Sequence, residues 1–130
     1  MNKLLITLVL TFISISATAG WTEFSGSSND GKVKIYYDRV NTKSKDNVIR
    51  VWQTKNYATK QTNDNKTYLS VKSLIEVNCK TKMFRTLAYN QYNQSMGRGE
   101  SVFQDSTPDE WQNIAPDVTA EDMRKFYCAK

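Results

Sequence analysis

Histidine is absent from the 130 residues of the chain. An imidazole is the side chain that most often acts as a general base near neutral pH, activates a nucleophilic serine or cysteine, and contributes to zinc sites. Every mechanism that needs an imidazole in one of these roles is therefore excluded. We expect a protein that is not an enzyme and that has no catalytic residues, no cofactor and no metal site.

Long apolar runs are also missing, except near the N-terminus, where residues 4–15 are apolar apart from three hydroxyl residues. This run is too short to cross the roughly 30 Å hydrocarbon core of a membrane. It follows Lys3 and leads to small residues that end at Ala19, which is the pattern of a secretory signal peptide. We therefore predict that residues 1–19 are removed, that residues 20–130 form one exported domain, and that no transmembrane segment remains.

Cysteine is scarce: the chain has two, Cys79 and Cys128. Oxidising compartments favour the pairing of an even number of cysteines in an exported protein. A metal pair or a reactive thiol is the alternative, but the chain has no histidine ligand and the spacing is unlike Cys-x-x-Cys. We predict a structural disulfide that closes a loop of about 50 residues and contributes about 4 kcal/mol of stability.

Short stretches of alternating apolar and polar residues dominate the rest of the chain, and turn-forming residues bound most of them. This period of two is typical of strands with one buried face. The predicted strands cover residues 21–24, 33–37, 48–57, 68–79, 83–92 and 101–104. The clearest alternation, over residues 68–79, predicts a central strand. Polar loops are expected over residues 38–47 and 55–66.

Two helix starts are predicted near the C-terminus. Thr107, Pro108 and the two acids after them are typical of a helix cap and predict a helical turn over residues 107–111. A second start at Thr119 predicts a helix that ends at about Ala129. Its apolar stripe consists of Ala120, Met123, Phe126 and Tyr127, with Cys128 at the flank. The predicted fold is α+β, a single antiparallel sheet of about five to six strands with the C-terminal helix packed on one face and tied by the disulfide.

Basic residues recur along the middle of the chain and alternate with tyrosines. Positive charge and aromatic faces together favour binding to polyanions, but the net charge is only +5, and a solvated surface is the plainer interpretation. The residues that we single out as contacts for a protein or polyanionic partner are Lys80, Lys82, Arg85, Tyr89 and Tyr92. Nucleic acid is not an expected partner, because an exported protein rarely meets it.

The order and spacing of several short motifs are more informative than any one of them. The motifs are Trp21, Tyr36-Tyr37-Asp38, Val51-Trp52, Glu76-Val77-Asn78-Cys79, Tyr89, Tyr92, Trp111-Gln112-Asn113-Ile114-Ala115-Pro116 and Cys128. In this order the chain resembles the surface-adhesin protein E-like family of Gram-negative bacteria, from Trp21 to Cys128. The resemblance implies an antiparallel sheet with a C-terminal helix tied to its concave side by a disulfide.

The resemblance also implies a function. Adhesins of this family bind host epithelial cells and matrix or serum proteins such as vitronectin and laminin. They resemble lipoproteins anchored by an N-terminal cysteine, whereas this sequence has Gly20 at the expected cleavage site. We expect an exported non-enzymatic binding protein, adhesin-like, that recognises a host surface or extracellular-matrix macromolecule. The alternative is a soluble periplasmic protein, such as an inhibitor or assembly factor, that binds another bacterial macromolecule. For the oligomeric state, we leave a homodimer open.

Overall fold

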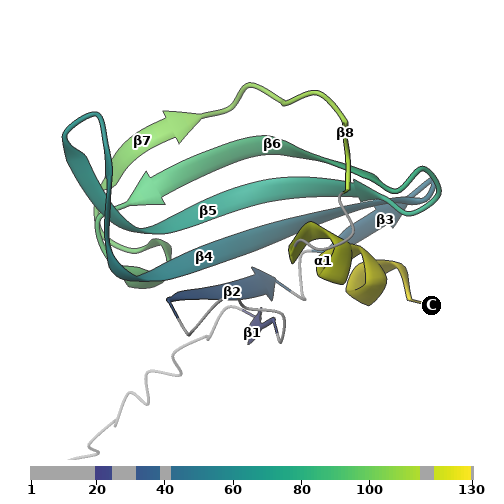
Figure 1. Cartoon of the computed structure of the whole chain (residues 1–130), viewed down its shortest axis with the longest axis horizontal. Coiled ribbons are helices and arrows are strands. Elements are labelled where there is room, and N and C mark those ends of the chain that lie inside the picture. Colours follow the sequence, from purple (N-terminus) through teal and green to yellow (C-terminus); the bar gives the residue numbers. More distant parts are fainter. Residues whose placement is uncertain (1–19, 25–31, 39–41, 115–118, 130) are drawn as a thin grey trace, which may run out of the picture.

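One antiparallel sheet and one C-terminal helix make up the part of the chain that the structure describes, a computed structural model of residues 20–24, 32–38, 42–114 and 119–129 (Figure 1). The strands are β1 (Trp21–Glu23), β2 (Val33–Asp38), β3 (Lys43–Lys45), β4 (Val48–Asn63), β5 (Lys66–Asn78), β6 (Met83–Tyr92), β7 (Ser101–Asp105) and β8 (Gln112–Asn113). The helical elements are the short 3-10 turn η2 (Ser95–Gly97) and α1 (Thr119–Cys128). The strand order is β1-β2-β4-β5-β6-β7, and β3 pairs with β4 while β8 pairs with β6.

The described sheet has eight strands, so the prediction of about five to six strands is wrong. The strands β3 and β8 are short and polar, and both are fully exposed. They pair along the ends of β4 and β6 through backbone hydrogen bonds rather than through burial. A pattern of apolar residues cannot detect such strands, and β3 lies inside the loop predicted over residues 38–47.

A long hairpin replaces the loop predicted over residues 55–66. Strand β4 continues to Asn63 and β5 begins at Lys66. The two residues between them, Asp64 and Asn65, have φ angles of 47° and 64°. Asp and Asn tolerate this left-handed backbone, and a two-residue turn with both φ angles positive matches the twist of the flanking strands. The polar segment is therefore strand instead of a loop, although its pairing with β5 is interrupted between Asn56 and Gln61.

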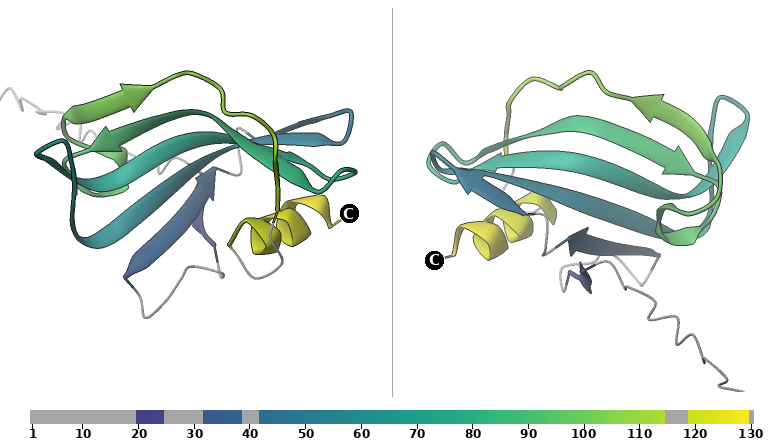
Figure 2. Two further views of the ribbon diagram at one scale, coloured as in Figure 1. Left: turned by 45° about the horizontal axis from the view of Figure 1, so that its top comes forward. Right: turned by 180° about the vertical axis from the view of Figure 1, so that it is seen from behind.

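The hydrophobic core lies between one face of the sheet and α1 (Figure 2). Its buried side chains are Phe24, Ile35, Tyr37, Ile49, Val51, Ile75, Val77, Met123 and Tyr127. Because successive side chains of a strand point to opposite faces, each strand divides its residues between the two sides of the sheet. We call the side that carries Ile49, Val51, Ile75 and Val77 the helix face. The opposite side, which carries Arg50, Trp52, Leu74 and Glu76, is the open face.

Aromatic rings join α1 to the strand β2. The ring of Tyr37 meets Phe126 edge-on with centroids 5.0 Å apart, and it meets Tyr127 at 5.5 Å. Such T-shaped pairs contribute about 0.5–1.5 kcal/mol each beyond the burial of area. Burial, together with the neighbouring Tyr37, raises the pKa of the Tyr127 hydroxyl. The predicted apolar stripe is confirmed at Met123 and Tyr127, whereas Phe126 is 47% exposed and the side chain of Ala120 lies outside the described residues.

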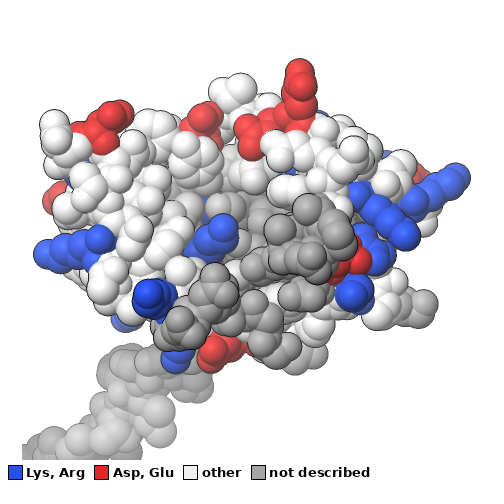
Figure 3. Space-filling model, viewed as in Figure 1, with Lys and Arg blue, Asp and Glu red and all other residues white. Residues whose placement is uncertain are grey.

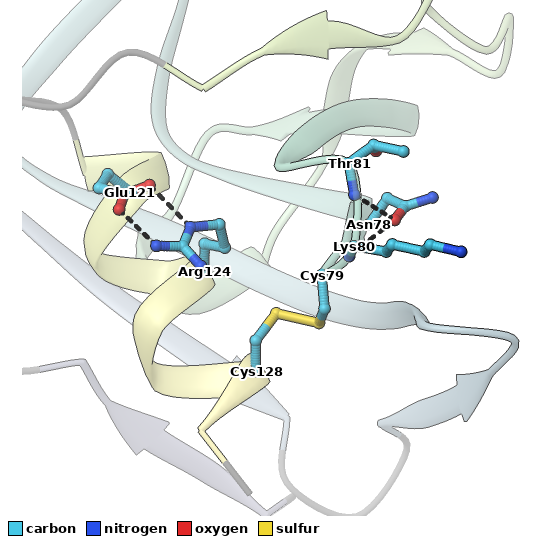
Figure 4. Close-up of a disulfide and its surroundings, with 7 residues drawn as sticks. All are labelled: Asn78, Cys79, Lys80, Thr81, Glu121, Arg124 and Cys128. Carbon is cyan, nitrogen blue, oxygen red and sulfur yellow. Dashed lines mark hydrogen bonds and ion pairs between the residues drawn. A yellow bond between two sulfur atoms is a disulfide. The ribbon is translucent and has the colours of Figure 1, made fainter.

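The predicted disulfide is confirmed. Cys79, directly after β5, is bonded to Cys128, the last residue of α1, and their Cα atoms lie 5.6 Å apart (Figure 4). On the sheet side, the Asn78 side chain accepts hydrogen bonds of 3.0 Å from the backbone N–H groups of Lys80 and Thr81. The cross-link therefore ties the helix to a turn whose own conformation is held by hydrogen bonds.

The helical turn predicted over residues 107–111 is wrong, because this segment is not helical and runs beside β6. The N–H of Asp109 donates to the carbonyl of Thr86 at 2.8 Å. The N–H of Thr107 donates to the side chain of Asp105, also at 2.8 Å. These amide groups are used by the sheet edge and by a local turn, so the capping pattern does not start a helix.

The signal peptide predicted over residues 1–19 lies outside the described residues and stays a prediction. Among the residues that the structure describes, no helix is both long and apolar enough to cross a bilayer. In the same ranges, no three or more Cys, Asp or Glu residues are grouped in a way that could hold a metal ion.

Removal of the disulfide is expected to destabilise the domain. The two cysteines are 49 residues apart, and opening a loop of that length with Cys128→Ser should lower the free energy of unfolding by about 2–4 kcal/mol. Urea unfolding followed by tryptophan fluorescence measures the change. Reduced wild-type protein is the control and should unfold at the midpoint of the variant, whereas an unchanged midpoint in both samples would contradict a stabilising role.

Candidate functional site

A row of three charged residues crosses the open face. Arg50 of β4, Glu76 of β5 and Arg85 of β6 are register partners in neighbouring strands, so their side chains lie side by side. One carboxylate oxygen of Glu76 lies 3.0 Å from Nη2 of Arg50, and the other lies 2.7 Å from Nη2 of Arg85. The Glu76 side chain is only 8% exposed, against 51% and 29% for Arg50 and Arg85. One negative charge thus holds two positive charges at the surface.

Two opposing effects set the pKa of Glu76. Burial alone would raise this pKa, but the hydrogen bonds from Arg85 and Arg50 outweigh burial and lower it. The carboxylate is therefore ionised at neutral pH and keeps both guanidinium groups in position. Arg85 also lies over the ring of Trp111, with 4.7 Å from its guanidinium carbon to the ring centroid. This cation–π contact reaches Arg85 from the segment before β8, which pairs with β6 on the side away from β5.

Lysines of strand β3 and of the β5–β6 turn lie at the same end of the sheet as the row. Strand β3 places Lys43 directly opposite Arg50. The tip of the β3–β4 hairpin meets the β5–β6 turn, where the N–H of Cys79 donates to the carbonyl of Asn47 at 2.9 Å. We call the resulting group the cationic end; it consists of Lys43, Lys45, Arg50, Lys80, Lys82 and Arg85. Figure 3 shows Lys and Arg side chains gathered at the end of the molecule where β3 lies in Figure 1.

The cationic end contains a hollow of about 410 Å³. Its lining consists of Lys43, Lys45, Asp46, Val48, Arg50, Glu76, Arg85 and Trp111. Cations outnumber acids in this lining, and Glu76 is already paired with two arginines. Guanidinium groups bind carboxylates, sulfates and phosphates in a planar, two-pronged geometry, which makes this hollow suited to an anionic group of a partner.

The structure brings together only part of the contact set predicted from the sequence. Three of its five residues belong to the cationic end, namely Lys80, Lys82 and Arg85. The ring of Tyr89 stacks on Phe103 with centroids 5.7 Å apart, and Tyr89 also borders a hollow of the sheet that Tyr92 lines. Tyr92 lies on the open face at the far end of β6. The structure therefore brings Tyr89 and Tyr92 together in one hollow, away from Lys80, Lys82 and Arg85.

Lys43 and Lys45 are among the basic residues that recur in the sequence, but the predicted contact set leaves them out, together with Arg50, because the β3–β4 hairpin was not recognised. A signal for it is present in the sequence. Asp46 and Asn47 have φ angles of 52° and 65°, as required by a two-residue hairpin turn, and these residue types tolerate that conformation. A hairpin at this place folds the lysines of β3 back onto Arg50.

The described residues define a small α+β domain in which a disulfide ties a C-terminal helix to one face of an antiparallel sheet. The chain belongs to the Surface-adhesin protein E family, whose model matches residues 21–129. This match confirms the family that the order of sequence motifs predicts. A comparison with curated proteins finds no match.

Solved structures of Haemophilus influenzae protein E share the fold. Crystal form II of that protein is 14% identical, with a TM-score of 0.66 over 85% of this chain and 88% of that chain. The selenomethionine form is 15% identical, with a TM-score of 0.65 over 86% and 88% of the two chains. A third structure is 15% identical, with a TM-score of 0.64 over 85% of each chain. At these identities the likeness establishes the fold.

Neutralising Glu76 is expected to destabilise the domain in a pH-dependent way. At pH 7, Glu76→Gln should lower the free energy of unfolding by about 1–2 kcal/mol, because two partly solvated guanidinium groups lose their partner. The folded pKa of Glu76 lies below its ordinary value of 4.5, so the contribution is complete above 4.5 and is lost as the pH falls through the folded value.

Urea unfolding of the wild type and Glu76→Gln at pH 7 and at strongly acidic pH measures this difference. The gap in free energy between the two proteins should shrink as the carboxyl group becomes protonated in the folded state. Glu100→Gln is the matched control, since Glu100 is exposed on the loop before β7. Equal stability of wild type and Glu76→Gln at pH 7 would contradict the role given to the carboxylate.

Proposed function

We propose that the chain is an exported, adhesin-like protein, not an enzyme, that binds a macromolecule of the host surface or extracellular matrix. Membership of the Surface-adhesin protein E family supports the adhesin-like role. The signal-peptide pattern of residues 1–19 supports export of a domain formed by residues 20–130. The lack of histidine, which removes imidazole catalysis, supports binding rather than turnover.

The cationic end supports this role most directly. It places six cations on two hairpin tips and on the row beside them, and Lys80 and Lys82 are exposed to solvent. Complementary charge speeds encounter with an anionic partner and fixes the orientation in which the partner docks. The partner is therefore a polyanion or a protein with an acidic patch. Tyr89 and Tyr92 remain predicted contacts, and their distance from the cationic end means that only an extended partner would reach them.

A soluble periplasmic protein is the second candidate, an inhibitor or assembly factor that binds another bacterial macromolecule. Gly20, rather than a cysteine, stands at the expected cleavage site, which supports this candidate. In this case the cationic end would serve a partner inside the cell envelope.

The location of the protein separates the two candidates. Antibody raised against residues 20–130 is expected to label intact cells, because an adhesin must be displayed to its partner. Permeabilised cells and an antibody against a periplasmic marker protein provide the controls. Labelling that requires permeabilisation would contradict the adhesin-like role and favour the periplasmic candidate.

The role of the cationic end is tested with heparin as a sulfated polyanion probe. We expect its affinity to fall steeply as salt rises from about 50 mM to about 200 mM, because binding releases counterions. The double variant Lys80→Gln/Lys82→Gln should bind several-fold more weakly, and its salt dependence should fall by about one ion for each lysine removed. Titration by calorimetry at several salt concentrations measures both effects.

The matched control is Lys60→Gln/Lys66→Gln, which removes two exposed lysines from the β4–β5 hairpin at the other end of the sheet. It should leave the affinity for heparin nearly unchanged. Binding that does not depend on salt, or an equal loss in both double variants, would rule out the cationic end as the contact surface.

A further inference from the structure

A second hollow, of about 380 Å³, lies on the open face and shares no lining residue with the hollow of the cationic end. It crosses the sheet from Trp21 of β1, at one edge, to Gln104 of β7 near the other. Its place is beside the charged row, because Trp52 follows Arg50 by two residues on the same face of β4. Aromatic and polar side chains alternate along it, in contrast to the predominantly cationic lining of its neighbour.

Aromatic rings contributed by three strands form the apolar part of this hollow. Trp21, Trp52 and Tyr92 line it, and all three are partly exposed. Leu74 of β5 is the register partner of Trp52 on one side and of Ala88 on the other, so the three residues form one row across the sheet. Because Ala88 carries only a methyl group, the hollow that it lines together with Trp52 stays open on the far side of Leu74. The result is a shallow aromatic trough rather than a closed cavity.

A lysine is held in place across this trough. Gly97 of η2 lies against the stem of Lys72 so closely that a Cβ at Gly97 would lie 2.8 Å from Cγ of the lysine. The N–H of Gly97 donates to the hydroxyl of Ser70 at 2.8 Å, which fixes η2 on the sheet. The ammonium group of Lys72 lies 5.5 Å from the ring centroid of Trp21. Lys72 is therefore positioned before any ligand arrives.

The polar groups of the trough are balanced in charge and varied in type. Lys72 contributes one positive charge and Asp38 one negative charge, Gln104 contributes an exposed amide, and Asn90 contributes its NH2 group, since its oxygen already accepts from the hydroxyl of Ser101. This balance disfavours a polyanion, and the number of polar groups disfavours a wholly apolar ligand. Sugar rings meet both conditions, because their C–H faces pack on aromatic rings while their hydroxyl groups exchange hydrogen bonds with amides and carboxylates.

We propose that this hollow binds a neutral saccharide of one or two rings, through Trp52 and Trp21 as stacking surfaces and Asn90, Gln104 and Lys72 as hydrogen-bonding groups. The volume of about 380 Å³ lies within the range of about 300–1,000 Å³ that is usual for small-ligand sites. This ligand class is distinct from the anionic partner of the cationic end. The open face then carries two sites side by side, one for neutral sugar and one for negative charge.

A glycan array with neutral and acidic oligosaccharides, probed with the disulfide-bonded protein, tests this site. We expect the wild type to retain neutral glycans at low and at high salt alike. Trp52→Ala should reduce their retention at least tenfold, and Trp52→Phe, which keeps an aromatic ring, should restore part of it. Trp111→Ala is the matched control, because that ring lies over Arg85 in the cationic end, and it should retain neutral glycans as the wild type does.

A second variant keeps the test decisive if Trp52→Ala fails to fold, as judged by its urea midpoint. Ala88→Leu places a larger side chain in the lining of the hollow. It should block the binding of neutral glycans without removing any proposed contact. The proposal would be overturned if the folded wild type retained no neutral glycan. It would also be overturned if Trp52→Phe and Ala88→Leu both retained neutral glycans as well as the wild type does. Retention of acidic glycans alone, abolished by Lys80→Gln/Lys82→Gln, would support the cationic end and overturn the saccharide site.

Discussion

The alternation of side chains along β4 and β5 is the constraint on which the rest of the structure depends. Val51 and Val77 are almost completely buried on the helix face, so their neighbours Trp52 and Glu76 must lie on the open face. A shift of one residue in the pairing would bury the charged row and expose the core. The disulfide places α1 on the helix face, so both of the proposed binding sites lie on the other side of the same two strands.

Glu76 explains how charge is kept close to the sheet without a large loss of stability. Removing a carboxylate from water is costly, but two guanidinium groups compensate it, and these remain 51% and 29% exposed. Arg50 and Arg85 are consequently held in place before an anion binds, so less side-chain entropy is lost on binding than for free surface lysines. Lys72 follows the same principle on the neighbouring hollow, where Gly97 and Trp21 hold it instead of a carboxylate.

Burial decides which parts of this molecule are predictable from sequence. The strand β6 has the predicted bounds, Met83–Tyr92, and the C-terminal helix and the disulfide are also where the patterns place them, since each is set by apolar contact or by redox chemistry. The polar strands β3 and β8 are invisible to such patterns because hydrogen bonds alone hold them. Half of the cationic end is missing from the predicted contact set. Strand β3 supplies Lys43 and Lys45, and the register of β3 with β4 places Arg50 beside them.

The turn at Asp64 and Asn65 has a practical consequence for work on this domain. It is exposed, it lies at the opposite end of β4 from the cationic end, and it lines neither hollow. Next to the turn, the side chain of Asn63 donates a hydrogen bond of 3.1 Å to the side chain of Gln91 on β6, so the hairpin is supported up to the turn itself. Insertions are tolerated best at such exposed tips. An epitope, a fluorophore or a point of attachment to a sensor chip belongs there, where it leaves both proposed binding surfaces free.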